Sequence, residues 1–232
     1  MVTLFQPDRV LLHRQIEKFG EYLTGSILDV GSGGYDRYSN LLKHASIDIR
    51  LDPFESGNVD VVGTSDYLPF KKESFDGILC TQVLQYVKDP QAVIHEFYRV
   101  LRRPSRIILT IPQTNEIDAA PHEYYRFTSF GISSLLEKAG FEVIALEQRG
   151  GLFSTLGQQI TRYFIDRLRL YDRNTFGRLA KLFLGVLGRA VIALDRLDRS
   201  NANRKHAIGW CVVAGKTAST GETPEVGIPE NR

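Results

Sequence analysis

The chain has 232 residues, of which 43% are hydrophobic and 24% are charged. This length and composition are typical of a soluble globular protein built from one α/β domain with an elaboration, and they exclude a largely disordered chain. The formal net charge of +2 is too small to indicate binding to nucleic acid, so we expect no nucleic-acid partner.

The charge is unevenly distributed along the chain. Residues 149–206 contain 12 Lys or Arg and 4 Asp or Glu, which gives a net charge of +8. The remainder holds 17 basic and 23 acidic residues, a net charge of −6. The sequence therefore predicts an acidic body with a basic segment near its C-terminal end.

The two cysteines, Cys80 and Cys211, both lie in apolar, strand-like runs. We expect both to be buried, reduced thiols, because free cysteine is among the most buried residue types. Their number and spacing indicate neither a disulfide framework nor a zinc site, and we expect no bound metal. The first 15 residues lack an apolar stretch followed by a cleavage site, which predicts a cytoplasmic protein.

Predicted helices and strands alternate at short spacing along most of the chain. In chain order, the expected elements are a helix over 10–23, a strand over 26–30, a helix over 35–44, strands over 46–51, 59–62 and 74–81, a helix from 89 or 90 to 101, a strand over 106–111, a helix over 129–139, and strands over 141–146 and 208–215. Such alternation predicts βαβ units and a doubly wound α/β fold with a mostly parallel sheet.

The strand pattern is interrupted between residues 150 and 206, where apolar residues fall at helical spacing. We therefore expect a basic helical insertion before the last strand. The predicted organisation is an N-terminal helix over 1–24, an α/β domain formed by 25–149 and 207–216, the insertion over 150–206, and a polar, disordered tail over 217–232.

A glycine turn follows the first predicted strand, with Gly31, Ser32 and Gly33 at its centre. Glycine permits a positive φ and a close approach of backbone to a ligand, and doubly wound sheets bind ligands at this edge. Asp52 ends the next strand, 21 residues after Gly31, where a carboxylate accepts hydrogen bonds from the ribose hydroxyls of an adenosine cofactor. An ordinary strand–helix turn and an Asp-Pro turn are the alternative interpretations.

Three details favour S-adenosylmethionine over a dinucleotide as this cofactor. The strict G-x-G-x-x-G pattern is absent, because residue 36 is Asp. Asp29 approaches the turn, where its carboxylate is placed to bind the ammonium of a methionine moiety. The third detail is the segment 59–79, which contains Leu-Pro-Phe and Ser-Phe-Asp.

With these motifs the chain resembles the methyltransferase type 11 group of class I methyltransferases, over about residues 25–148 plus the final strand. Matching pieces are the glycine turn, the acidic strand end, and residues 63–70, 74–76, 83–90 and 99–104. The resemblance implies a Rossmann-like, doubly wound sheet of seven strands whose last strand is antiparallel, and S-adenosyl-L-methionine as the cofactor.

Several positions depart from the family pattern. The family acid near adenine falls at Thr64, so the backbone of Ser65 or the side chain of Asp66 is expected to serve instead. The family His after the fourth strand is Tyr86 here. The resemblance also places two residues beside the sulfonium, at the end of the fourth strand. These are Thr81 and Gln82.

Residues 121–128 resemble a motif, P-x-D-Y-W-R-F-T, of methyltransferases often associated with surface-polysaccharide biosynthesis. We expect this segment to line the acceptor pocket, with His122 as the general base and Glu123 beside it. Tyr86, Tyr124 and Arg126 are the expected acceptor contacts. An exposed loop histidine and a structural pair of Arg126 with an acid remain alternatives.

The basic insertion is typical of an element that binds a membrane surface, and a helical cap or homodimer interface is the alternative. The sequence thus predicts an S-adenosylmethionine-dependent methyltransferase that acts on a small-molecule, sugar or lipid-linked acceptor, by O-methylation. Two other classes stay open, a cofactor-binding protein without chemistry and a peripheral membrane scaffold. Lipid binding would attach this cytoplasmic protein to the inner face of the membrane.

Overall fold

The computed structural model describes residues 4–170 and 177–217, except the side chains of residues 177–179 and 181. Seven strands form a single sheet in the order β3-β2-β1-β4-β5-β7-β6. The strands are β1 Gly25–Val30, β2 Ala45–Asp52, β3 Val61–Val62, β4 Phe75–Thr81, β5 Leu101–Pro112, β6 Glu142–Arg149 and β7 Gly209–Lys216. β7 is antiparallel to both of its neighbours, and the other paired strands are parallel, which confirms the predicted fold class.

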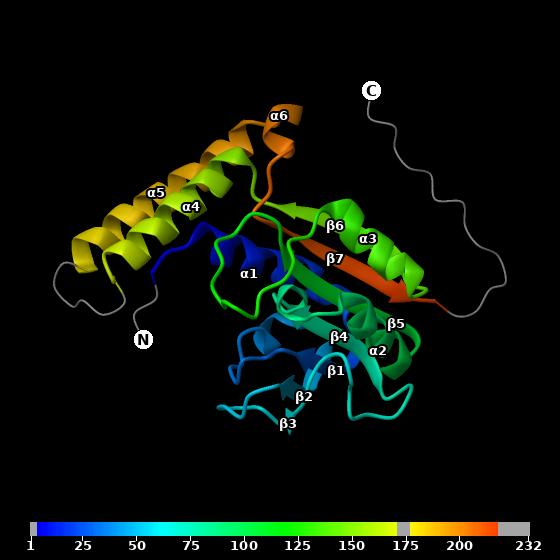
Figure 1. Cartoon of the computed structure of the whole chain (residues 1–232). Helices are drawn as coiled ribbons and strands as arrows, with labels where there is room; N and C mark the ends of the chain where they lie inside the picture. The colour runs from blue at the N-terminus through cyan, green and yellow to red at the C-terminus, as the bar shows by residue number, and fades with distance from the viewer. Residues whose placement is uncertain (1–3, 171–176, 218–232) are drawn as a thin grey trace.

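Helices cover both faces of the sheet (Figure 1). The α-helices are α1 Pro7–Phe19, α2 Pro90–Val100, α3 Ser129–Lys138, α4 Leu152–Arg167, α5 Gly177–Leu197 and α6 Asn201–Arg204, and the 3-10 turns are η1 Gly20–Tyr22, η2 Ser39–Leu41 and η3 Leu84–Tyr86. The apolar faces of α2 and α3 pack on one side, and that of α1 packs on the other.

Alternation along the central strands divides their side chains between these two cores. In β4, Ile78 and Cys80 join the core with α2 and α3, whereas Leu79 joins the core with α1. Cys80 and Cys211 are both buried and free, as the apolar runs around them predict.

The helix predicted over 35–44 is wrong, because this connection contains only the short turn η2. Asp36 explains the difference: its Oδ1 accepts hydrogen bonds from the backbone N–H and the hydroxyl of Ser39. Its Oδ2 also lies 3.3 Å from Nη2 of Arg50. Local side-chain bonds of this kind compete with the helical backbone ladder.

The predicted helical insertion is present as a hairpin of α4 and α5 that projects from the sheet (Figure 1). Near the end of α5, the carboxylate of Asp195 accepts hydrogen bonds from the backbone N–H groups of Gly151, Phe153 and Ser154, at 2.8–3.0 Å. These bonds satisfy donors that the first turn of α4 leaves unpaired. Of the predicted disordered tail, residues 218–232 lie outside the described residues.

Candidate active site

The turn after β1 brings the backbone of the first strand close to the end of the second. Gly31 has φ +73° and Gly33 has φ +64°. A Cβ on Gly31 would lie 2.2 Å from a methyl carbon of Val83, so both the conformation and the space require glycine. The N–H of Gly31 donates to the carbonyl oxygen of Leu51 at 2.8 Å.

Asp52 lies at the end of β2, directly against this turn. Its Oδ2 accepts a hydrogen bond from the N–H of Gly33 at 2.8 Å, and its Oδ1 accepts one from the N–H of Phe54 at 3.0 Å. Each carboxylate oxygen has two lone pairs, so both oxygens retain an acceptor site. Asp52 is therefore positioned by backbone donors and can still receive two hydroxyl groups.

A first cavity of about 600 Å³ opens beside Asp52, within the size range of small-molecule sites. Its walls come from the ends of β1, β2 and β4 and from the loop after β5. Its lining residues are Val30, Gly31, Leu51, Asp52, Pro53, Phe54, Thr64, Ser65, Asp66, Gln82, Val83, Tyr86, Val87, Lys88, Ala119, His122 and Tyr124. The lining is mostly apolar, with Asp52 and Asp66 as its carboxylates.

A second cavity of about 920 Å³ shares Gly31, Gln82 and Tyr86 with the first. It is more polar, and its walls include side chains from α1, from the loop over 35–38, from the loop after β5 and from α4. Thr81 and Glu123 line only this cavity among the predicted site residues. The two cavities therefore meet at the carboxyl ends of β1 and β4.

Three of the residues predicted to bind the cofactor line neither cavity, namely Asp29, Ser32 and Gly33. Ser32 is buried, and its hydroxyl accepts the N–H of Gly34 at 3.4 Å. Asp29 is buried beside the turn, and burial raises the pKa of its carboxyl to about 7, against the attraction of Arg50. A buried carboxylate of this kind is stabilised by a nearby cation.

Gln82 directly follows β4 and lies in the left-handed region, with φ +57°, which is rare for a residue other than glycine. Its N–H donates to the carbonyl oxygen of Thr110 at 2.8 Å. With its amide oriented so that the oxygen faces the nearby donors, Gln82 accepts from Nη2 of Arg149 at 3.0 Å. These contacts hold Gln82 at the junction of the two cavities.

Arg149 is fully buried at the end of β6, and it belongs to none of the motifs that predicted the site. Its Nε lies 2.6 Å from Oδ1 of Asp8, at the start of α1. The guanidinium therefore joins α1 to Gln82 and to β6, and its partners Asp8 and Gln82 both line the second cavity. No sequence signal marks this pair, because residues 8 and 149 meet only through the fold.

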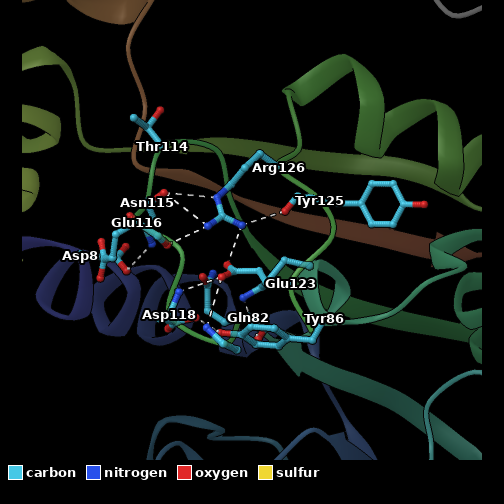
Figure 2. A network of polar contacts seen from close by, with 12 residues as sticks. Asp8, Gln82, Tyr86, Thr114, Asn115, Glu116, Asp118, Glu123, Tyr125 and Arg126 are labelled. Atoms are coloured by element: carbon cyan, nitrogen blue, oxygen red, sulfur yellow. Dashed lines mark hydrogen bonds and ion pairs between the residues drawn. The ribbon is translucent and has the colours of Figure 1, made fainter. Parts of the chain in front are cut away.

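The loop after β5 is held by Glu123 and Arg126 (Figure 2). Oε1 of Glu123 lies 2.6 Å from Nη1 of Arg126, and Oε2 accepts the N–H of Asp118 at 2.8 Å. Burial acts to raise the pKa of Glu123, but the hydrogen bonds and Arg126 outweigh it and hold that pKa below its usual value. Arg126 also donates to the carbonyl oxygens of Asn115 and Glu116.

Arg126 is thus paired with an acid, and it lines neither cavity. Both oxygens of Glu123 are engaged within the loop, although the residue lines the second cavity. These contacts hold the loop together. The roles of Glu123 as a catalytic residue and Arg126 as an acceptor contact stay predictions.

His122 and Tyr124 are exposed and line the first cavity. Tyr86 lines both cavities, and its hydroxyl donates to Oδ1 of Asp118 at 2.9 Å (Figure 2). Burial and the neighbouring Asp118 raise the pKa of Tyr86 well above its usual value, so its hydroxyl stays protonated. Asp118 lines the second cavity and was also missed, since nothing in its sequence context distinguishes it from a loop residue.

Comparison with known proteins identifies the domain that carries this site. Residues 28–109 match the model of a family described as a methyltransferase domain. This match covers 82 of the 232 residues, about a third of the chain, and it identifies that part as a domain of the methyltransferase type 11 kind. The protein is accordingly an S-adenosylmethionine-dependent methyltransferase, and its cofactor is S-adenosyl-L-methionine.

Individual relatives are distant. An uncharacterized protein of Methanocaldococcus jannaschii is 24% identical over 160 residues, which are 62% of this chain and 78% of that protein. Among solved structures, the [4+2]-cyclase SpnF has a TM-score of 0.58 at 19% identity, covering 91% of this methyltransferase and 81% of that chain.

Phosphoethanolamine N-methyltransferase 2 of Haemonchus contortus, solved with S-adenosyl-L-methionine, has a TM-score of 0.54 at 17% identity. The match covers 91% of this chain and 53% of that one. Likeness at these identities concerns the fold, and it does not identify the acceptor of this methyltransferase.

Proposed function

We propose that this methyltransferase transfers the methyl group of S-adenosylmethionine to a hydroxyl group of a polar acceptor, such as a sugar or a sugar-bearing lipid. The observation that carries the proposal is the meeting of two cavities at Gly31, Gln82 and Tyr86. A cofactor and an acceptor that occupy adjoining cavities can bring the methyl carbon and the hydroxyl oxygen together at the shared wall.

The first cavity suits the adenosine part of the cofactor. Asp52 is placed to accept hydrogen bonds from the two ribose hydroxyls, and the apolar wall that includes Phe54 and Val83 suits a planar base. Ser65 and Asp66 supply the polar groups near the adenine edge. The methionine part then crosses Gly31, with its ammonium directed toward Asp29.

The second cavity suits an acceptor rich in hydroxyl groups. Two of its carboxylates are already paired with arginines, Asp8 with Arg149 and Glu116 with Arg162. Paired charges present both donors and acceptors without a strong net charge, and hydroxyl groups match both kinds of partner.

O-methylation also requires a group that accepts the hydroxyl proton. His122 is the base predicted from the sequence, but it lines only the first cavity. Asp118 lines the second cavity, and the hydroxyl of Tyr86 orients its carboxylate. We therefore assign the base to Asp118, with His122 as the alternative.

The test is a transfer screen with methyl-labelled cofactor against sugars, glycolipids, phenols and amines, using Asp118→Asn and His122→Gln. We expect transfer to hydroxyl compounds. Asp118→Asn should reduce turnover by about 10²- to 10⁴-fold and leave S-adenosylhomocysteine affinity unchanged. The control is Glu137→Gln, which changes a carboxylate on α3 that lines neither cavity.

The two variants separate the two bases. If Asp118 is the base, Asp118→Asn loses turnover and His122→Gln keeps it; if His122 is the base, the reverse holds. Transfer to amines alone would contradict O-methylation. Cofactor binding without transfer to any acceptor class would instead favour a binding protein without chemistry.

A further inference from the structure

The outer surface of the α4–α5 hairpin is apolar and exposed. On α5, Leu182 is 67% exposed, Phe183 is 63% exposed and Leu197 is 81% exposed. Val186 lies between them on the same side of the helix, because residues three and four apart share a face. A row of large, exposed apolar side chains on a projecting helix is typical of a surface that binds a partner.

The neighbouring helix continues this surface. Leu156, Ile160, Tyr163 and Phe164 recur at helical spacing on α4 and are all exposed. We refer to the exposed apolar residues of the two helices together as the hairpin face. Its members are Leu156, Ile160, Tyr163, Phe164, Leu182, Phe183, Val186, Leu194 and Leu197.

The hairpin does not need this face for its own packing. Gly157 of α4 lies so close to α5 that a Cβ there would come 2.7 Å from Val191. Leu184 and Ile192 fill the inner side of α5 and are buried. The helices are therefore already packed together through a separate set of residues, which leaves the hairpin face to another partner.

The charges around the hairpin face identify the chemistry of that partner. The described side chains of residues 152–205 include 8 Lys or Arg and 3 Asp or Glu. Among the acids, Asp195 is engaged in capping α4. Exposed arginines of the two helices and the following loop include Arg167, Arg196 and Arg199.

A second copy of this chain would fit the charge poorly. A symmetric dimer through the same surface brings each basic rim against its own copy, and like charges across an interface are unfavourable. A partner that is apolar inside and negatively charged at its surface matches both the apolar side chains and the arginines around them. A bilayer that contains anionic lipids has this arrangement, with acyl chains below phosphate groups.

We propose that the hairpin face docks on an anionic lipid surface. The apolar side chains enter the boundary between headgroups and acyl chains, and the arginines lie at the level of the lipid phosphates. Within the described residues, no helix is both long and apolar enough to cross a bilayer.

Docking also has a geometric consequence for the methyltransferase site. Gln158 and Arg162 of α4 line the second cavity, whereas Ile160 and Tyr163 of the same helix belong to the hairpin face. The second cavity therefore lies one helix away from the docked lipid surface. At that distance an acceptor held in the membrane can reach the cavity. Only this consequence depends on the proposed function.

The test is co-sedimentation of the full-length protein with vesicles of phosphatidylcholine, with or without 30% phosphatidylglycerol. We expect binding to the anionic vesicles that weakens as NaCl increases from about 0.1 to 0.5 M, because salt screens the charges. Leu182→Glu combined with Val186→Glu should lower binding by about tenfold or more, and so should Arg196→Glu combined with Arg199→Glu.

Matched controls alter the body of the protein in the same way. Phe130→Glu changes an apolar side chain on α3 that is 81% exposed, and Lys71→Glu combined with Lys72→Glu reverses two exposed charges. Both controls should bind anionic vesicles as the wild type does. S-adenosylhomocysteine binding of every variant verifies that the site domain is folded, independently of lipid binding and of methyl transfer.

Two results would overturn the proposal. One is an absence of binding to both kinds of vesicle by the folded wild-type protein. The other is a dimer in sedimentation velocity that the Leu182→Glu and Val186→Glu changes convert to a monomer, without any vesicle binding. That second result would identify the hairpin face as an interface between copies of this chain.

Discussion

Asp29 lies at the centre of the pH behaviour of this methyltransferase. Burial raises the pKa of its carboxyl to about 7, so the carboxyl is largely protonated below that pH. A protonated carboxyl binds an ammonium group poorly. We therefore predict that S-adenosylhomocysteine affinity increases as pH rises from 5 to 7 and then levels off, as calorimetry will measure.

The variant Asp29→Asn provides the control for this prediction. It should bind the ligand more weakly at pH 7.5 and lose the increase between pH 5 and 7. The free protein gives a second readout. Because the pKa of Asp29 is higher in the folded than in the unfolded state, its contribution to stability is present below about pH 4 and is lost as pH rises through about 7. The unliganded wild type should therefore lose stability relative to Asp29→Asn over that range.

Asp52 gives a prediction about the ribose. Asp52→Ala should weaken S-adenosylhomocysteine binding by about 10- to 150-fold, since hydrogen bonds to a charged group contribute about 1.5–3 kcal/mol. The change also removes the acceptor for Gly33 and Phe54, so a loss of affinity alone does not identify the ribose.

A cofactor analogue without ribose hydroxyls separates the two effects of this change. If Asp52 binds the ribose, the wild type should bind the analogue weakly, and Asp52→Ala should cause little further loss. An equal loss with both ligands would mean that Asp52 acts only through the turn.

At the scale of single residues, the sequence identifies groups whose position follows from a motif. The sequence places the glycine turn and Asp52 at the ends of adjacent strands, and in the structure the N–H of Gly33 in that turn donates to Asp52. Sequence patterns do not identify Asp8, Asp118 or Arg149, because each of them acts through a contact with a residue far away in the chain. An arginine is usually exposed, so its burial cannot be predicted before its partner is known.

Among the elements, the attachment of the hairpin depends on Asp195. We predict that Asp195→Ala lowers the free energy of unfolding by about 1–2 kcal/mol, because three backbone donors at the start of α4 lose their acceptor. Hydrogen exchange should show faster exchange at the amides of Gly151, Phe153 and Ser154.

Asp198→Ala is the matched control for the cap. The carboxylate of Asp198 accepts only from Ser200 in the described contacts, away from the start of α4. It should leave the exchange of the α4 amides unchanged. Equal exchange in both variants would show that Asp195 does not stabilise the start of α4.

Most elements of the sheet follow from the sequence, because strands buried on both faces read as short apolar runs. The prediction of a helix over 35–44 is wrong because local side-chain hydrogen bonds outweigh the helical spacing of the apolar residues. The carboxylate of Asp36 accepts hydrogen bonds from the backbone N–H and the hydroxyl of Ser39, and these bonds form a turn in place of the helix. The sequence also predicts the insertion as helical, but its projection from the body depends on packing that no local pattern reveals.

For the whole molecule, the first cavity predicts a strong coupling between cofactor binding and folding. Its walls come from strands and loops that meet only in the folded chain, so a ligand there stabilises the folded state alone. S-adenosylhomocysteine at 100 times its dissociation constant should add about 2.7 kcal/mol. We predict an increase in Tm of about 5–10 °C, measured by calorimetry.

The control ligand for this measurement is adenosine, which fills only the part of the site proposed for the first cavity. At the same free concentration, adenosine should stabilise the protein less than S-adenosylhomocysteine does, because it should bind more weakly. An absence of any shift with S-adenosylhomocysteine, at concentrations that saturate binding, would contradict a site formed only on folding.

The place of β7 in the sheet also determines when the sheet can be completed during synthesis. β7 lies between β5 and β6, although it follows both in sequence. Until residues 209–216 leave the ribosome, β5 and β6 each have an unpaired edge, and such edges are prone to join other chains. A nascent chain that stalls inside the hairpin therefore has a gap in its sheet, and it needs protection from aggregation until synthesis resumes.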